Sequence, residues 1–423
     1  MTKKTETKKK TATKKKADSK KKTTTKKETD TKPKRTPKKK EEPEEDLWTP
    51  QKAREAALAS IRKRHGAGTV RRASELPDIF SLRRPSGIPS LDIILKGGFP
   101  AGGPVHIIGK DGAGKTDLSW RMIAQAQKNY GDNAVCAFAS IEHWPDTSQA
   151  RLAGVTVPFS DAEIRRMEAK HGEEFDDEEM YHLKKEIGVV DFPGAPTTAG
   201  ILEEVVDMYQ SGAYQIIVVD SIGAMATEAE MEVELGQDAR TASLATLITQ
   251  FMKRIWQLCR TELAEGIYNE TTLVILNQWR SEVRNKNPQM SDLRIGGGNA
   301  LRHGKLVDLL VQGGGKVRKN DNKEGDVIGK KVYARVLKGK AGMHEGDTAE
   351  WRFIFGEGVD VPYDVLTVGM EMGLIEMGGS WYHMPDGKKY QGKHRAKRHV
   401  MEFYDDIMER AVSVYQIPDY RVT

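Results

Sequence analysis

The chain has few cysteines and no long apolar run. Only Cys136 and Cys259 occur in 423 residues, which supports neither a disulfide framework nor a cysteine-based zinc site. No apolar run approaches the roughly eighteen residues of a membrane-spanning helix. The N-terminus also lacks the apolar segment of a secretory signal. We therefore expect a cytoplasmic protein in a reducing compartment, without contact to a membrane.

Positive charge is concentrated in the first 40 residues. They hold eighteen lysines and one arginine against four acidic residues, a net charge of +15. Because the whole chain carries +6, residues 41–423 carry −9. Residues 1–46 form a Lys/Thr-rich tail with almost no apolar side chains, which predicts disorder. Such a polycation can hold DNA phosphates without reading their sequence, or it can be a solubilising tail, and the composition leaves both interpretations open.

One glycine-rich stretch organises the rest of the chain. Residues 105–116 read VHIIGKDGAGKT and contain the G-x-x-x-x-G-K-[ST] spacing of a phosphate-binding loop. The apolar run before the loop predicts a buried strand, and LSWRMIAQAQ after it predicts a helix. Backbone N–H groups of such a loop and the helix N-terminus turn toward phosphate oxygens. We expect Lys115 to reach the β- and γ-phosphates of a bound nucleotide and the Thr116 hydroxyl to bind Mg²⁺. The expected nucleotide contacts are Gly109, Lys110, Asp111, Gly112, Ala113, Gly114, Lys115 and Thr116.

Three further predicted strands deliver polar residues to one edge of a sheet. Strands that alternate with helices predict a parallel α/β sheet, in which ligands bind beyond the carboxyl ends of the strands. Asp220 has the Walker B position and would hold Mg²⁺ through water. Glu142 is then available to activate an attacking water, and Gln278 can hydrogen-bond the γ-phosphate. Together with the phosphate loop they predict NTP hydrolysis. These strands are expected at 133–143, 215–221 and 272–278.

Several helices are expected outside this core pattern. The acidic, charged segment of about 156–187 indicates a solvated surface insertion, and Ser160 with Glu163 forms the signature of a capping box. Strong helix formers with a proline at the first position predict a further helix ahead of the core. The expected helices include 50–65, one that begins at Ser160, 176–187, and one capped by Thr198 that ends at Tyr209.

Two stretches lack periodicity and follow the polar strand ends. Residues 230–242 follow the Asp220 strand, and residues 280–296 follow Gln278 and carry four basic side chains. A loop this long inside a compact core is usually functional or disordered. Because the second stretch begins beside the predicted γ-phosphate contact, the nucleotide state could order it. Ordinary mobile surface loops are the alternative for both stretches.

In this order, the motifs resemble the bacterial RecA recombinase family from about Pro50 to the C-terminus. The shared strings include GKDGAGKT, FASIEH, IIVVDS, EAEMEVELG, LNQWR, GGNAL, LKGKA, FGEG and LIEMGGSWY. The resemblance implies an α/β fold: a RecA-like P-loop ATPase core with a mostly parallel sheet, an N-terminal helix and a small C-terminal α/β domain. The implied divisions are an oligomerisation helix and linker at 47–85, the ATPase core at 86–355 and a DNA-gathering domain at 356–423.

The resemblance also implies roles in ATP turnover. Glu142 matches the catalytic glutamate of the family, and Gln278 matches its γ-phosphate switch. Lys338 and Lys340 match a pair that reaches the ATP of a neighbouring subunit, although without the resemblance they read as surface charge. Asp146 matches a nucleoside contact. The helix at 50–65 matches an element that packs on the adjacent protomer.

DNA contacts are implied at three places. The two aperiodic stretches sit at the positions of the family's DNA-binding loops, where Val283 would wedge between nucleotide triplets. In the C-terminal domain, the basic run 388–398 would contact the phosphates of duplex DNA, with a solvated loop as the alternative. We expect Trp381 and Tyr382 to belong to the core of that domain. The expected DNA contacts are Arg280, Val283, Arg284, Lys286, Arg294, Gly236, Arg240, Lys393, Arg395 and Lys397.

Some positions depart from the family pattern. Gln149 stands where the family usually stacks a tyrosine on adenine, and His303 replaces a phenylalanine that relays ATP state between subunits. The insertion and the lysine tail lie outside the pattern, and the acidic C-terminal tail of many bacterial members is missing. These features fit a divergent or phage-encoded member.

The resulting hypothesis is an ATP- and Mg²⁺-dependent recombinase in the bacterial cytoplasm. It would form a homo-oligomeric helical filament on single-stranded DNA and pair it with duplex DNA in recombination, repair and the DNA-damage (SOS) response, with repressor or mediator proteins as further partners. A RecA-fold helicase or branch-migration ATPase is one alternative, although two cysteines cannot build the zinc module of RadA relatives. A non-enzymatic DNA-coating protein is the other, and the intact set of Lys115, Glu142 and Asp220 argues against it.

Overall fold

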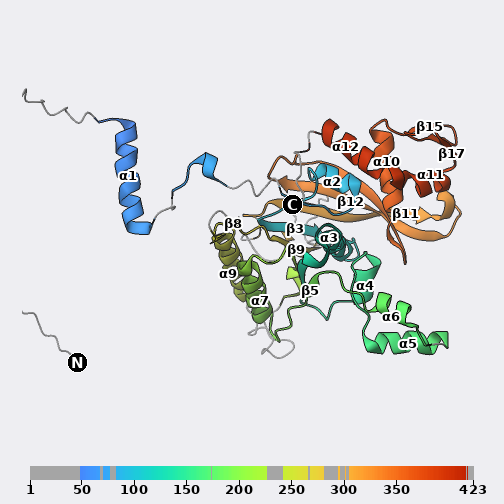
Figure 1. Ribbon diagram of the computed structural model, residues 1–423, viewed down its shortest axis with the longest axis horizontal. Coiled ribbons are helices and arrows are strands. Elements are labelled where there is room, and N and C mark those ends of the chain that lie inside the picture. The colour runs from blue at the N-terminus through green and yellow to red at the C-terminus, as the bar shows by residue number, and fades with distance from the viewer. Residues whose placement is uncertain are drawn as a thin grey trace, which may run out of the picture. The chain divides into compact units, whose positions relative to one another are not determined.

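A computed structural model gives the fold of most of the chain (Figure 1). Contacts between residues divide the chain into two compact units, residues 1–73 and 74–423. The predicted divisions near residues 46, 85 and 355 remain predictions. The described residues are 48–66, 70–76, 82–172, 174–225, 242–264, 267–280, 294–295, 301, 304–415 and 417. The predictions that fall outside them concern the tail 1–46 and the residues Gly236, Arg240, Val283, Arg284, Lys286 and His303.

The first unit contains the helix that the sequence predicts at residues 50–65. Helix α1 spans Pro50–His65, and the Thr49 side chain caps it by accepting a hydrogen bond from the Lys52 backbone N–H. Pro50 fits the first helical position, where its missing N–H costs nothing. None of the side chains of α1 is buried. In the described part of the chain, no helix is both long and apolar enough to cross a lipid bilayer.

The second unit is built on a mixed sheet with the strand order β14-β13-β12-β11-β3-β9-β6-β4-β5. Neighbouring strands from β11 to β5 run parallel, whereas β12, β13 and β14 continue the sheet antiparallel. This confirms the predicted α/β fold with a mostly parallel sheet. The strands are β3 Gly103–Gly109, β4 Val135–Ser140, β5 Val189–Asp191, β6 Ile216–Asp220, β9 Thr272–Arg280, β11 Val307–Arg318, β12 Val327–Gly339, β13 Thr348–Ile354 and β14 Gly358–Val359.

Alternation along the parallel strands covers both faces of the sheet. In β6, Ile216 and Val218 belong to one core, while Ile217 and Val219 belong to the other. Successive side chains of a strand point to opposite faces, so a fully apolar strand needs helices on both sides. The first core includes α3 (Lys115–Tyr130), and the second includes α7 (Thr198–Ser211) and α9 (Ala242–Leu258). In Figure 1, α7 and α9 lie together on one side of the strands, away from α3.

A smaller α/β module follows the sheet at the C-terminal end of the chain. It has its own core, to which Ile93 of α2 (Pro89–Ile94) contributes. Tyr382 lies in this core at 5% exposure, as predicted, but Trp381 is 43% exposed, so the prediction for Trp381 was wrong. The elements are α10 Val361–Glu371, β15 Glu376–Gly378, β16 Trp381–His383, β17 Lys389–Gln391, α11 Lys393–His399 and α12 Tyr404–Val414.

Three predicted element boundaries differ from the structure. Thr197, not Thr198, caps α7, because Thr197 has the extended backbone of a cap and its side chain accepts from the Gly200 N–H. The second helix of the insertion, α6 (Asp177–Leu183), ends four residues before Ile187. The predicted loop 280–296 is bounded by strand pairing, since β10 (Arg294–Ile295) pairs antiparallel with the end of β9.

The remaining described elements connect this framework. The capping box predicted at Ser160 and Glu163 is present at the start of α5. These elements are β1 Arg83–Arg84, β2 Phe99–Pro100, α4 Thr147–Leu152, α5 Asp161–His171, β7 Glu262–Ala264, β8 Ile267–Tyr268, and the short 3₁₀ turns η1 Ala73–Glu75, η3 Gly131–Asn133, η4 Ile222–Ala224, η7 Lys319–Asp321 and η8 Val400–Phe403.

Candidate nucleotide site

The phosphate loop connects the end of β3 to the start of α3. At Gly109 an added Cβ would lie 2.3 Å from the Val311 carbonyl oxygen, so only glycine fits against the neighbouring strand. Gly114 caps α3 in the left-handed region, with φ of 102°. A side chain there would strain the backbone. The two glycines therefore set the path of the loop around the N-terminus of α3, which favours anion binding.

Lys115 lies at the centre of this loop. It is only 7% exposed, and its Nζ donates to the carbonyl oxygens of Gly109 at 3.0 Å and Lys110 at 2.9 Å. Burial lowers the pKa of the Lys115 ammonium, while nearby carboxylates, Asp111 and Asp220 among them, oppose that shift. The positive charge is thus held where a phosphate would enter the loop. Until a phosphate binds, the two carbonyl oxygens accept the hydrogen bonds of the ammonium.

Thr116 and Asp220 lie side by side in the pocket. The Thr116 hydroxyl donates to Asp220 Oδ2 at 2.8 Å. Burial raises the pKa of Asp220, against the effects of this hydrogen bond and of Lys115. A hydroxyl and a carboxylate at the end of a strand are hard oxygen ligands of the kind that Mg²⁺ prefers. The donor set therefore fits a magnesium ion between the protein and a phosphate.

Glu142 and Gln278 face the same pocket as the loop. Ser221, which follows Asp220 across a cis peptide bond, donates to Glu142 Oε1 at 3.4 Å. Gln278 lies two residues before the end of β9, level with Gly109 of β3 in the parallel register. The pocket measures about 520 Å³, and Glu142, Asp220 and Gln278 all line it together with the loop. The structure thus brings the residues predicted at the strand ends together.

The pocket also contains residues that the sequence does not reveal. Lys330 of β12 donates through Nζ to the Gly112 carbonyl oxygen. Its Nζ lies 5.5 Å from the centre of the Phe353 ring, and Phe353 and Phe355 line the pocket as well. Phe355 begins the FGEG string, but no motif marks Lys330 or Phe353, because these two reach the loop only through the pairing of β12 with β11 and β13.

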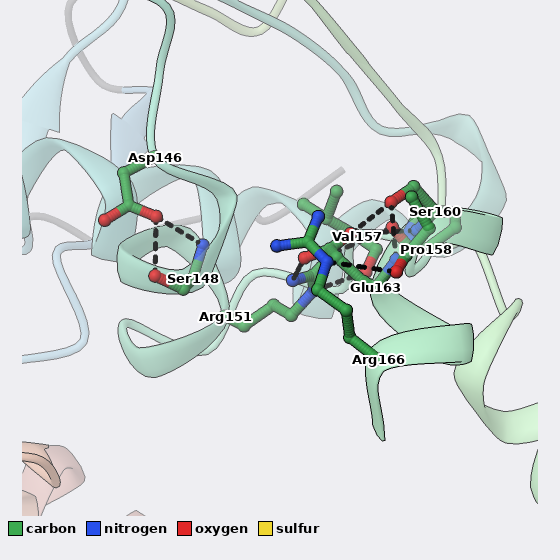
Figure 2. Close-up of polar contacts among 9 residues, drawn as sticks. Asp146, Ser148, Arg151, Val157, Pro158, Ser160, Glu163 and Arg166 are labelled. Atoms are coloured by element: carbon green, nitrogen blue, oxygen red, sulfur yellow. Dashed lines mark hydrogen bonds and ion pairs between the residues drawn. The ribbon is translucent and has the colours of Figure 1, made fainter. Parts of the chain in front are cut away.

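The rim of the pocket is connected to the insertion through α4 (Figure 2). Arg151 of α4 donates to the carbonyl oxygens of Val157 at 3.0 Å and Pro158 at 2.9 Å, and forms an ion pair with Glu163 of α5 at 2.9 Å. Gln149 and Leu152 of the same helix line the pocket. The insertion is therefore attached to a helix that borders the nucleotide site.

Asp146, the predicted nucleoside contact, has a structural role in this conformation. It caps α4, and its Oδ1 accepts the backbone N–H of Ser148 at 2.9 Å (Figure 2). These hydrogen bonds lower the pKa of the Asp146 carboxyl. Asp146 is not among the pocket-lining residues, whereas the nearby Gln149 is.

Lys338 and Lys340 lie away from the phosphate loop of their own chain. In the sheet, Lys338 is opposite Asp308, which in turn is level with His106, the middle residue of β3. The phosphate loop follows Gly109 at the end of β3, and neither lysine lines the pocket. The register therefore separates these lysines from the nucleotide site within one chain.

Two of the predicted DNA-contacting lysines form ion pairs with carboxylates of the same chain. Lys393 pairs with Asp321 at 2.6 Å, and Lys397 pairs with Asp360. Arg395 on the same helix, α11, is exposed. Arg280 and Arg294, the other predicted contacts in described segments, are register partners of the β9–β10 pair.

The fold and the site define a P-loop α/β protein whose phosphate-loop pocket lies at the carboxyl edge of a mostly parallel sheet. The family model of the RecA N-terminal domain matches residues 52–161 and 190–360. Protein RecA of Francisella tularensis subsp. novicida (strain U112) is 31% identical over 378 residues, covering 87% of this chain and 90% of that protein. Protein RecA of F. tularensis subsp. tularensis (strain WY96-3418) gives the same values.

The chain therefore belongs to the RecA family. The family model leaves residues 162–189 unmatched. This gap contains nearly all of α5 and the whole of α6, so the charged helical pair is an addition to the family core.

Proposed function

We propose that this protein is an ATP-dependent DNA recombinase, which assembles on single-stranded DNA as a helical filament and exchanges strands with homologous duplex DNA. The observation that carries the proposal is the convergence of Lys115, Thr116, Glu142, Asp220 and Gln278 on one pocket in a chain of the RecA family. Recombination and repair are the processes that such an activity would serve.

The phosphate loop would hold ATP by geometry more than by net charge. Backbone N–H groups of residues 109–116 and the N-terminus of α3 surround the phosphates, and Lys115 exchanges its two carbonyl acceptors for phosphate oxygens. Thr116 directly, and Asp220 through water, would hold Mg²⁺. The ion would supply positive charge that offsets the negative charge developing on the phosphoryl group during transfer.

Hydrolysis would be carried out by Glu142. Glu142 lines the pocket, and its carboxylate accepts a hydrogen bond from Ser221, which would orient it toward a water molecule. A positioned carboxylate can accept the proton of the attacking water. Lys338 and Lys340 of an adjacent copy would complete the charge neutralisation, since the register keeps them from the pocket of their own chain.

Gln278 would connect the nucleotide to the DNA. Two residues after Gln278, β9 ends at Arg280, where it pairs with β10. A hydrogen bond from Gln278 to the γ-phosphate would therefore act close to Arg280, where β9 pairs with β10, and close in sequence to the predicted DNA contacts Val283, Arg284 and Lys286. In this proposal, the ATP-bound state favours the arrangement in which Arg280, Arg294 and the residues between them hold DNA. Gly236 and Arg240, which follow β6 in the chain, would hold DNA as well. Hydrolysis would release it.

Strand exchange between circular single-stranded DNA and homologous linear duplex DNA tests this function. We expect joint molecules with ATP and Mg²⁺, none with a heterologous duplex, and open filaments by electron microscopy. Closed rings would indicate a helicase-like enzyme. ATP hydrolysis that does not respond to single-stranded DNA, or DNA coating without any ATP dependence, would contradict the proposal.

A further inference from the structure

A second cationic pocket lies at the tip of the β11–β12 hairpin, separate from the nucleotide site. It has a volume of about 290 Å³. Its charged lining comprises five basic side chains and one carboxylate: Lys316, Arg318, Lys323, Lys331, Arg352 and Asp321. An excess of positive charge in a concave site raises the local concentration of anions.

The single carboxylate of this pocket is already neutralised by two cations. Asp321 accepts from Arg352 at 2.8 Å and from Lys393 of α11 at 2.6 Å. These contacts keep the pKa of Asp321 below its usual value, although partial burial acts in the opposite direction. Asp321 therefore remains ionised, and its one negative charge is smaller than the positive charge of the five basic side chains of the lining.

Arg352 forms a fixed floor for the pocket. Its side chain is 13% exposed, and its guanidinium carbon lies 3.7 Å from the centre of the Tyr363 ring. Stacking on an aromatic ring and an ion pair with Asp321 hold the planar guanidinium in one orientation. An arginine held in this way loses little side-chain entropy when it binds an oxyanion.

The rim of the pocket carries exposed lysines. Lys331 is paired with Glu350 at 2.6 Å, and Arg318 donates to the Gly325 carbonyl oxygen at 2.6 Å. In contrast, Lys316 and Lys323 are exposed and form no ion pair with any residue that the structure describes. Their ammonium groups can turn toward an incoming anion with little loss of existing contacts.

We propose that this pocket binds a backbone phosphate of duplex DNA. The ion pair between Asp321 and Lys393 ties the hairpin tip to α11, whose Arg395 and Arg398 are also exposed and face no described carboxylate at ion-pair distance. The two elements thus form one basic surface, whose separate cations can contact several phosphates of one polymer. A phosphodiester chain satisfies separate cation groups at once, which a free phosphate cannot. The inference rests on the proposed DNA-dependent function.

The first experiment measures duplex DNA binding by fluorescence anisotropy over a range of salt concentrations. The double variant Lys316→Gln, Lys323→Gln is compared with Lys170→Gln, Lys185→Gln, which removes the same charge from exposed positions of the insertion. Each phosphate contact contributes about 0.9 to the slope of log affinity against log salt, so the hairpin variant should lose about 1 to 2 from its slope. The control should keep the slope of the unmodified protein. Equal slopes in both variants would overturn the proposal.

The second experiment locates the contact and identifies its source. Lysine acetylation followed by mass spectrometry is carried out on the full chain alone, with duplex DNA, and with inorganic phosphate at the same phosphate concentration. We expect duplex DNA, and not inorganic phosphate, to protect Lys316 and Lys323 while Lys170 and Lys185 stay reactive. Equal protection by inorganic phosphate, or no protection by DNA, would overturn the assignment to the DNA backbone.

These readouts do not depend on catalysis. If the unmodified protein failed in strand exchange and in DNA-stimulated ATP hydrolysis, the proposed function would fall. A salt slope that still depends on Lys316 and Lys323 would keep the hairpin pocket as a DNA contact. The converse result would be strand exchange together with a salt slope that does not depend on Lys316 and Lys323. It would contradict the proposed DNA contact at the hairpin pocket but not the proposed recombinase function.

Discussion

Two regions of this molecule offer positive charge to phosphates, and they are built in opposite ways. In the nucleotide pocket, Lys115 is buried, held by two carbonyl oxygens and surrounded by backbone N–H groups. At the hairpin tip and α11, the cations are exposed or half-buried, and carboxylates such as Asp321 and Asp360 engage some of them. Salt screens exposed charges strongly and buried ones weakly.

The comparison teaches how each region should respond to mutation. Binding in the pocket depends on the geometry of a few groups, so the loss of one group should be severe. Binding on the exposed surface is shared among many cations, so each loss should be graded and should depend on salt. The predictions below test this contrast, beginning with the largest expected effect.

Lys115→Ala should remove ATP hydrolysis, because it deletes the only buried ammonium among the described residues that line the pocket. Loss of a preorganised charge at a reacting phosphoryl group costs about 100-fold or more in rate. Lys128→Ala, an exposed change on the same helix, serves as the control and should hydrolyse ATP normally. Turnover by the Lys115 variant within about tenfold of the unmodified rate would break the contrast.

Glu142→Gln should bind ATP but hydrolyse it slowly. The amide keeps an oxygen that can accept from Ser221, but it cannot take a proton from water. Removal of a general base costs about 10²- to 10⁴-fold. Single-turnover hydrolysis together with equilibrium binding of a fluorescent ATP analogue separates the two steps. Undiminished turnover would show that another group is the base.

Mixing two inactive variants tests whether the lysines act between copies. Lys338→Ala, Lys340→Ala retains Glu142, and Glu142→Gln retains both lysines. If each site uses Glu142 of one copy and the lysines of the next, an equal random mixture restores about one quarter of the sites at head-to-tail interfaces. Each variant alone is the control, with filament formation checked by light scattering. No recovery in a mixture that co-assembles would place the lysines elsewhere.

Asp364→Asn should give the smallest effect, a change in the pH dependence of stability. The carboxylate is buried between α10 and α2, accepts the Ser90 N–H at 2.8 Å, and burial raises its pKa to about 7. The folded state therefore binds the proton more tightly than the unfolded state, so stability is lost as the pH rises from about 4 to about 7. Asparagine can accept the same hydrogen bond without a charge.

The measurement for this prediction is the melting temperature between pH 5 and pH 8. The difference between the Asp364→Asn variant and the unmodified protein should increase toward pH 8, with each kcal/mol shifting the midpoint by about 2–4 °C or less in a chain of this size. Glu376→Gln removes an exposed carboxylate of the same module and should show no such trend. A constant difference across the range would contradict the assigned titration.

The nucleotide pocket was predictable because its signals are local. The phosphate loop is contiguous in sequence, and apolar runs of strand length mark where Asp220 and Gln278 reach the sheet edge. Lys330 was not predictable, since it meets Gly112 across 218 residues of chain. The pairing of Lys393 with Asp321, 72 residues away, was hidden for the same reason. Such contacts depend on strand register, as for Lys330, or on the packing of helix α11, as for Lys393, and no local pattern fixes either.

Two errors concern pairs of neighbouring residues. Trp381 and Tyr382 are adjacent in β16 and point to opposite faces of its sheet, and only the face with Tyr382 belongs to the core of the module. Thr197 and Thr198 both have side chains that can cap a helix, and the choice depends on which residue adopts the extended backbone. The first prediction needed the face that packs on the core, and the second needed the backbone angles.

Lys338 and Lys340 do not line the phosphate-loop pocket of their own chain, and this has a consequence for assemblies of any size. If a following copy supplies these lysines, one terminal copy in every stack has no donor, and its active site stays half-built. In a short filament, the fraction of subunits with an incomplete active site is then larger than in a long one. The rate of ATP hydrolysis per subunit would therefore rise with filament length. A subunit added at one end would complete the active site of its neighbour, whereas a subunit added at the other end would have its own site completed.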